Sequence, residues 1–78
     1  MEKTLDKFKI GEKGIVKTVK GEGAIRRRLL DMGITPTCEI LLKQRAPLGD
    51  PLEIFLRGYS LTLRKNEASF VILEVEEK

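Results

Sequence analysis

Two segments of the chain carry apolar residues at every second position, which is the pattern of β-strands buried on one face. These residues are Cys38, Ile40 and Leu42 within residues 37–45, and Leu52, Ile54 and Leu56 within residues 52–57. Residues 15–19, 59–63 and 70–76 are also short and rich in Val, Ile, Leu, Thr or aromatic residues. The sequence therefore predicts about five short strands.

One segment has the spacing of an α-helix instead. Ile25, Leu29 and Met32 stand at positions i, i+4 and i+7, which share one helix face. Gly33 suits the left-handed residue that ends a helix, and Pro36 prevents its continuation. We expect this helix to follow the first strand. Residues 4–10 are expected to form a helical turn or an irregular lead-in, and residues 65–68 a single turn.

The connections between the predicted strands are short and stiff. The loop at residues 46–51 holds Pro47, Gly49 and Pro51, and Gly58 permits a tight reversal between two strands. A sheet of such short strands would expose both of its edges unless it closes on itself. The sequence therefore predicts a mainly β fold, a small SH3-like barrel of about five strands with one short helix after the first strand. We expect residues 1–78 to form a single domain.

Strand parity also predicts a surface. If the even-numbered apolar residues of 37–45 and 52–57 share the core, even positions pair with even ones and odd with odd. Leu41 and Phe55 then lie opposite or diagonal to each other outside the barrel. Left uncovered, they and Leu48 form an apolar docking patch rimmed by Lys43, Arg45 and Arg57. The alternative is that the helix, or Leu5 and Phe8 of the amino-terminal segment, covers them.

Composition excludes most kinds of catalytic chemistry. The 78 residues include 15 Lys and Arg, 12 Asp and Glu, one Cys and no His, for a net charge of +3. Without histidine there is no usual general base, and the lone Cys38 makes neither an internal disulfide nor a zinc site. No glycine-rich phosphate loop, signal peptide or membrane-spanning run is present. We expect a cytoplasmic protein that is not an enzyme.

We also expect no bound metal and no cofactor. Carboxylates without imidazole hold ferrous iron loosely, and Cys38 shares the parity of buried residues, so we interpret it as a small core side chain. The oxygen and sulfur ligands that the sequence offers are Asp31, Asp50, Glu53, Glu67, Met32 and Cys38.

Longer motifs resemble a known family. Residues 21–34 read G-E-G-A-I-R-R-R-L-L-D-M-G-I, and residues 45–57 read R-A-P-L-G-D-P-L-E-I-F-L-R. Arg57-Gly58-Tyr59 and Arg64-Lys65-Asn66-Glu67-Ala68 follow. Over residues 5–75 the chain resembles the ferrous iron transport protein A (FeoA) family. One departure is Thr37, where the family often has glycine, and it is expected to affect the turn before the second strand.

The resemblance implies an SH3-like barrel that acts as a cytosolic accessory of the ferrous iron permease, a membrane protein with a cytoplasmic GTPase domain. Arg26, Arg27 and Arg28 are candidate contacts for an acidic partner or phosphate, because guanidinium groups bind both bidentately. Their alternative role is a solvated helix face, since adjacent helical residues point about 100° apart. We expect a monomer or weak self-association.

Two other functions remain open from the sequence. A small basic barrel can bind single-stranded nucleic acid, although the four aromatic residues are scattered over different elements. Similar barrels also form the carboxy-terminal domain of metal-dependent repressors, which makes a metal-sensor-type regulatory domain the other alternative.

Overall fold

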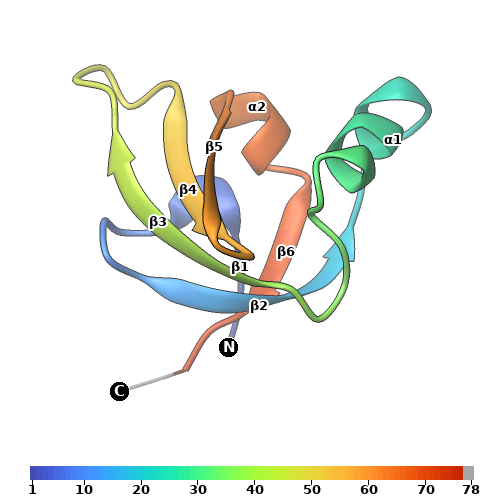
Figure 1. The fold of residues 1–78 in the computed structure, drawn as a ribbon, viewed down its shortest axis with the longest axis horizontal. Coiled ribbons are helices and arrows are strands. Elements are labelled where there is room, and N and C mark those ends of the chain that lie inside the picture. Colours follow the sequence, from blue (N-terminus) through green and yellow to red (C-terminus); the bar gives the residue numbers. More distant parts are fainter. Residues whose placement is uncertain (77–78) are drawn as a thin grey trace.

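The computed structural model describes residues 1–76 and contains one six-stranded antiparallel sheet with strand order β1-β6-β2-β3-β4-β5 (Figure 1). The strands are β1 (Glu2–Thr4), β2 (Lys13–Val19), β3 (Glu39–Arg45), β4 (Leu52–Leu56), β5 (Tyr59–Leu63) and β6 (Val71–Glu74). The helical elements are the 3₁₀ turn η1 (Leu5–Lys7), helix α1 (Ala24–Asp31) and helix α2 (Lys65–Ala68). No helix in the described part is long and apolar enough to cross a membrane.

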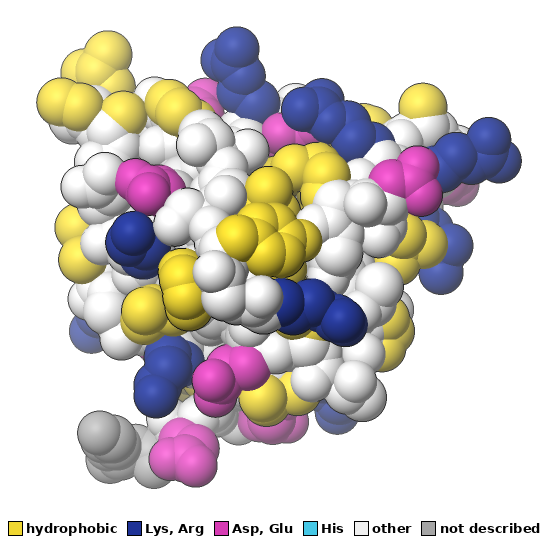
Figure 2. Space-filling model, in the orientation of Figure 1, with side chains coloured by type: hydrophobic (Ala, Val, Ile, Leu, Met, Phe, Trp, Pro, Cys, Tyr) yellow, Lys and Arg dark blue, Asp and Glu magenta, His cyan; other side chains and the backbone are white. Residues whose placement is uncertain are grey.

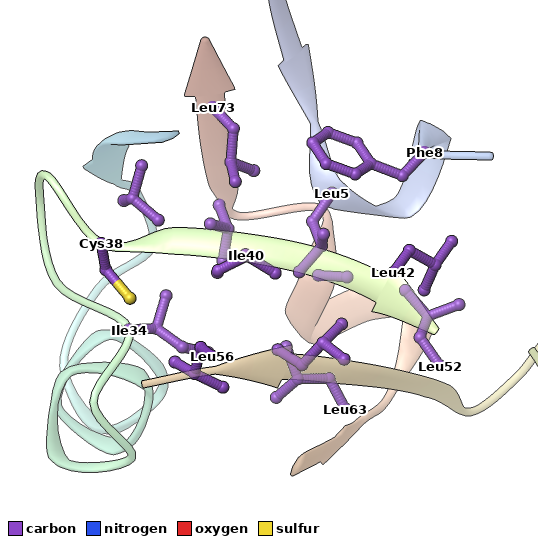
Figure 3. Packing of buried hydrophobic residues seen from close by; sticks show 14 of the residues in the cluster. Leu5, Phe8, Ile34, Cys38, Ile40, Leu42, Leu52, Leu56, Leu63 and Leu73 are labelled. Atoms are coloured by element: carbon purple, nitrogen blue, oxygen red, sulfur yellow. The ribbon is translucent and has the colours of Figure 1, made fainter. Parts of the chain in front are cut away.

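The sheet bends around one apolar core (Figure 1), and Figure 3 shows buried side chains of this core packed together. Leu5, Leu29, Ile40, Ile54 and Leu73 have no exposed surface, although they come from five different elements. Two β-bulges interrupt the ladder, at Lys17 between β2 and β6 and at Lys43 between β3 and β4. Because a bulge increases local twist and bend, the two bulges help a short sheet to curl over its own core. The predicted mainly β, SH3-like architecture is confirmed, but the expected closure of the sheet is not: among the described residues β1 and β5 do not pair, and they remain the two edges of the sheet.

The strand that sequence analysis missed is β1. Its Glu-Lys-Thr sequence has no apolar residue, yet it pairs with β6 from Glu2↔Glu74 to Thr4↔Ile72. The turn η1 follows it and buries Leu5, with Phe8 buried just beyond. The expected helical turn in this region is confirmed, and the sheet has six strands rather than about five.

Helix α1 ends where the Tyr59 side chain lies close to the backbone of Met32 and Gly33, and this contact explains the Met-Gly-Ile motif. Gly33 has φ 97°, its N–H donates to the Leu30 carbonyl (3.0 Å), and Ile34 N–H donates to the Leu29 carbonyl (3.1 Å). These two bonds are those of a Schellman cap. Tyr59 Oη donates to the Met32 carbonyl (2.7 Å), and a Cβ on Gly33 would lie 2.5 Å from that hydroxyl. The conformation therefore favours glycine here, and a Cβ would in addition push the Tyr59 hydroxyl out of its hydrogen bond to Met32.

Thr37 adopts a left-handed backbone conformation, which glycine would favour. Its φ is 77°, a left-handed value that costs a residue with a Cβ atom roughly 1–2 kcal/mol. The turn is held there because Thr37 N–H donates to the Val16 carbonyl and Val16 N–H donates to the Cys38 carbonyl, both at 2.8 Å. As a result β3 begins at Glu39 rather than at residue 37.

We therefore expect Thr37→Gly to stabilise the protein. Relief of the left-handed strain outweighs the greater flexibility of glycine in the unfolded chain, for a net gain of about 1 kcal/mol, or roughly 4–8 °C in melting temperature. Thermal unfolding measures this gain. Thr37→Ala is the matched control, because it keeps a Cβ and should change stability little. A loss of stability in the glycine variant would show that the backbone of Thr37 is not strained.

Candidate partner-binding surface

The predicted pair of Leu41 and Phe55 lies on the outer face of the sheet. The two residues are direct partners between β3 and β4, Phe55 is 39% exposed and Leu41 is half-buried. Leu5 and Phe8 do not cover them, since both side chains are buried in the core. The alternative in which the amino-terminal segment shields this pair through those two residues is therefore wrong.

A shallow depression of about 540 Å³ surrounds this pair. Its lining residues are Lys13, Thr37, Cys38, Glu39, Leu41, Phe55, Leu56 and Arg57. Arg57 donates to Thr35 Oγ1 at 2.8 Å, a neutral partner that leaves the guanidinium charge uncompensated. Lys43 reaches over the Phe55 ring, with Nζ 6.0 Å from its centroid, and lies 3.6 Å from Glu53 Oε2. An apolar floor with a charged rim results.

The expected even-to-even register holds only for part of the hairpin. Leu42 pairs with Ile54, but the bulge at Lys43 shifts the ladder, so Gln44 pairs with Glu53 and Arg45 with Leu52. The extra residue lets Lys43 and Gln44 both be exposed. The prediction that even positions pair with even ones and odd with odd is wrong beyond Leu42, because the hydrophobic period does not reveal an inserted residue.

Arg45 consequently belongs to the fold rather than to the rim of the patch. Its Nη2 atom donates to the carbonyl oxygens of Asp6 (2.7 Å) and Phe8 (2.6 Å), and Nη1 lies 3.5 Å from the Gly49 carbonyl. A single guanidinium thus joins η1 and the segment after it to the end of β3 and the hairpin loop. The expectation that Arg45 rims the patch is wrong.

Leu48 is a separate apolar feature. Its side chain is 96% exposed at the tip of the β3–β4 loop. The tip lies beyond the Arg45↔Leu52 pair. Leu41 lies four residues before Arg45, which is roughly 13 Å along β3. Leu48 therefore does not join Leu41 and Phe55 in one patch as expected.

The loop that carries Leu48 is tied down at its base. Ala46 N–H donates to the Pro51 carbonyl (3.0 Å), Gly49 N–H donates to the Ala46 carbonyl (2.7 Å), and the Asp50–Pro51 peptide is cis. Asp50 Oδ1 accepts from the Lys65 N–H of α2 at 2.9 Å. The Ala-Pro-Leu-Gly-Asp-Pro motif thus holds a rigid turn with one leucine presented to solvent.

The three arginines of α1 have different surroundings. Arg26 Nε donates to the Val19 carbonyl (3.3 Å), and Arg28 Nη1 lies 2.9 Å from Glu67 Oε2, whose side chain is only 9% exposed. The Arg27 side chain makes no hydrogen bond or ion pair within residues 1–76, and it borders two depressions beside Gly23 and Asp31. Arg27 is therefore the guanidinium that is free to meet an acidic group.

The candidate metal ligands are dispersed. Within residues 1–76 no three Cys, Asp or Glu side chains are grouped so that they could hold an ion. Asp50 accepts from α2, Glu53 accepts from Gln44, and Glu67 Oε1 accepts from the Arg64 N–H at 2.9 Å. Cys38 is 5% exposed, which confirms its interpretation as a small core residue.

Comparison with known proteins decides the family. The model of the FeoA domain matches residues 3–75. The chain belongs to the FeoA domain family. It is accordingly a non-catalytic accessory domain of ferrous iron transport, and the expectation that it is not an enzyme is confirmed by this membership.

Solved and curated relatives agree with this assignment. The FeoA-like protein of Clostridium acetobutylicum is 40% identical and superposes with a TM-score of 0.91, over 99% of this chain and 90% of that one. The zinc complex of FeoA from Stenotrophomonas maltophilia, an SH3 domain protein, is 26% identical with a TM-score of 0.82, over 92% and 89% of the two chains. A fusion protein of Fe(2+) transport protein A and the Fe(2+) transporter FeoB from Porphyromonas gingivalis is 31% identical over 91% of this chain. This chain spans only 8% of that fusion protein.

The arrangement of the arginines predicts different effects for neighbouring substitutions. Arg28→Ala leaves the largely buried Glu67 carboxylate without its cation and should lower the free energy of unfolding by about 1 kcal/mol. Arg27→Ala, the matched control one residue away, removes no side-chain hydrogen bond or ion pair within the described residues and should change the free energy of unfolding by less than about 0.5 kcal/mol. Urea denaturation measures both values. Equal losses would show that Arg27 also serves the fold.

Proposed function

We propose that this protein is a cytoplasmic accessory that binds and modulates the cytoplasmic GTPase portion of a ferrous iron permease. The observation that carries this proposal is the Porphyromonas gingivalis relative, in which the domain and the transporter form one fusion protein. A fusion keeps its two parts at high effective concentration, which suits parts that work in contact. Two parts that are not fused need a docking surface to achieve the same proximity.

The surface that we assign to this contact has three parts. Leu41 and Phe55 supply the apolar centre, and Arg57 supplies a charge at its border. Leu48 supplies an apolar contact on a rigid loop, which loses little entropy on binding. Arg27 supplies the free cation of α1, with Arg26 and Arg28 held beside it by the fold.

Such a protein acts by differential contacts rather than by chemistry. A binding partner shifts a conformational equilibrium only as far as it binds one state more tightly than the other. If it prefers one nucleotide-dependent state of the GTPase, nucleotide must in turn change its affinity by the same factor. Modulation and nucleotide-dependent binding are therefore two measurements of one coupling.

The first test measures binding directly. The purified protein should bind the cytoplasmic region of the permease with an affinity that differs between the nucleotide-free and GTP-bound forms, and it should hydrolyse no GTP alone. Isothermal titration calorimetry and a phosphate-release assay measure these properties. An RNA oligonucleotide serves as the control ligand. Tight RNA binding that weakens steeply with salt, together with no affinity for the permease, would favour the nucleic-acid alternative instead.

The second test separates docking from folding. We expect Leu41→Ser with Phe55→Thr to weaken permease binding at least tenfold while the melting temperature changes by only a few degrees, because both side chains lie outside the barrel. Ile54→Thr is a matched control on the buried side of β4, and it should lower the melting temperature substantially. If the double variant unfolds as readily as the control, the outer pair belongs to the core.

A further inference from the structure

Among the residues that the structure describes, strand β5 is an edge of the sheet with unpaired backbone groups. Arg57 and Gly58 have φ 49° and 87°, which makes the β4–β5 connection a two-residue type I′ turn closed by the Leu56↔Tyr59 pair. In such a hairpin the closing pair is hydrogen-bonded and the next pair is not. The N–H and C=O groups of Ser60 and Thr62 therefore point away from β4, toward the side where the sheet has no further strand (Figure 1).

This edge lacks the features that usually protect an edge strand. Natural edges are short, bulged, or interrupted by proline or charged residues. The sequence of β5 is Tyr-Ser-Leu-Thr-Leu, with no charge and no proline, and its five pairs with β4 run without a bulge. The opposite edge, β1, is only three residues long and contains Glu2 and Lys3. An open, regular edge of this kind is a template for an added strand.

Positive charges stand at both ends of β5. Arg57 precedes the strand, and Arg64 with Lys65 follows it. All three are exposed, and among residues 1–76 none of their side chains pairs with a carboxylate. Figure 2 shows the corresponding face, where hydrophobic side chains near the middle have Lys and Arg side chains above and below them, with Asp and Glu side chains in between.

These charges decide between two occupants of the edge. A second copy of the chain could align Ser60 with its Thr62 in antiparallel register, but this would place Arg57 opposite Lys65 at both ends. Like charges directly opposite each other are destabilising. A foreign strand with carboxylates at each end makes two favourable contacts instead. Charge complementarity therefore favours an acidic-ended segment of another protein.

The side-chain row across the sheet adds a second requirement. Leu41, Phe55 and Ser60 are successive cross-strand partners on the outer face. Ser60 Oγ accepts from Lys43 Nζ at 3.3 Å, and the same Nζ lies over the Phe55 ring, so an apolar residue on an added strand would pack against the aliphatic stem of Lys43 beside that ring. The added strand should thus carry a long apolar or aromatic side chain at this position.

We propose that β5 binds, by strand addition, an extended segment of another protein that is apolar on one face and bears acidic residues at both ends. In this proposal the Arg57-Gly58-Tyr59 and Arg64-Lys65 motifs have the same role, because each places positive charge at one end of β5. The inference goes beyond the function proposed above and holds whichever protein supplies the strand.

A synthetic peptide tests the inference without the permease. The probe is Asp-Asp-Thr-Leu-Thr-Phe-Thr-Asp-Asp, and the two controls replace its aspartates by lysines or N-methylate alternate residues along one edge. We expect the acidic probe to bind and to slow hydrogen exchange of the Ser60 and Thr62 amides in NMR spectra. Each control should bind at least tenfold more weakly. No detectable binding of the probe, or equal binding of the N-methylated peptide, overturns strand addition.

A variant pair tests the same contact from the side of the protein. Ser60→Pro removes an outward N–H without removing a bond to β4, so it should weaken peptide binding at least tenfold, whereas Ser60→Ala should not. If the proline variant does not fold, the N-methylated peptide decides. Sedimentation of the free protein completes the test. A dimer whose Ser60 and Thr62 amides are protected would overturn the proposal in favour of a second copy.

Discussion

The β-bulge at Lys43 decides which side chains of β3 face the amino-terminal segment and which face the outer side of the sheet. By inserting one residue into β3, it turns the Arg45 side chain toward the amino-terminal segment while leaving Leu41 in register with Phe55 outside. The guanidinium of Arg45 then satisfies the carbonyls of Asp6 and Phe8, which would otherwise lose hydrogen bonds on burial. An unbulged hairpin would leave η1 without this anchor and would turn Arg45 toward the outer face.

The sequence predicts the core better than it predicts the irregularities that shape the surface. Alternation identified Leu42, Ile54 and the outer pair because burial imposes a period of two. It did not reveal the bulge, because Lys43 and Gln44 are both polar and an extra polar residue leaves the hydrophobic pattern intact. It also missed β1, whose residues join the sheet through backbone hydrogen bonds rather than through apolar burial. Backbone pairing of this kind leaves no hydrophobic signal.

The same limitation applies to the arginine cluster of α1. Three consecutive arginines look equivalent in sequence, but helical geometry points them in directions about 100° apart. Arg26 and Arg28 reach a backbone carbonyl and a largely buried carboxylate, and only Arg27 is left without such a partner in the described chain. The sequence offered no signal for this distinction, because the partners lie on β2 and α2.

The outer face and the open edge meet at Phe55 and Ser60, which are cross-strand partners. A segment added to β5 would therefore lie at the border of the surface that we assign to the permease. The added segment and the permease then either compete for this border or belong to one continuous interface. Both contacts rest on strands held by backbone ladders, and binding there requires little ordering of the domain itself. Differential affinity for two states of a partner must then arise from movement in the partner. A rigid domain of this kind is suited to select one state of a moving GTPase domain, because its own surface does not adapt to both.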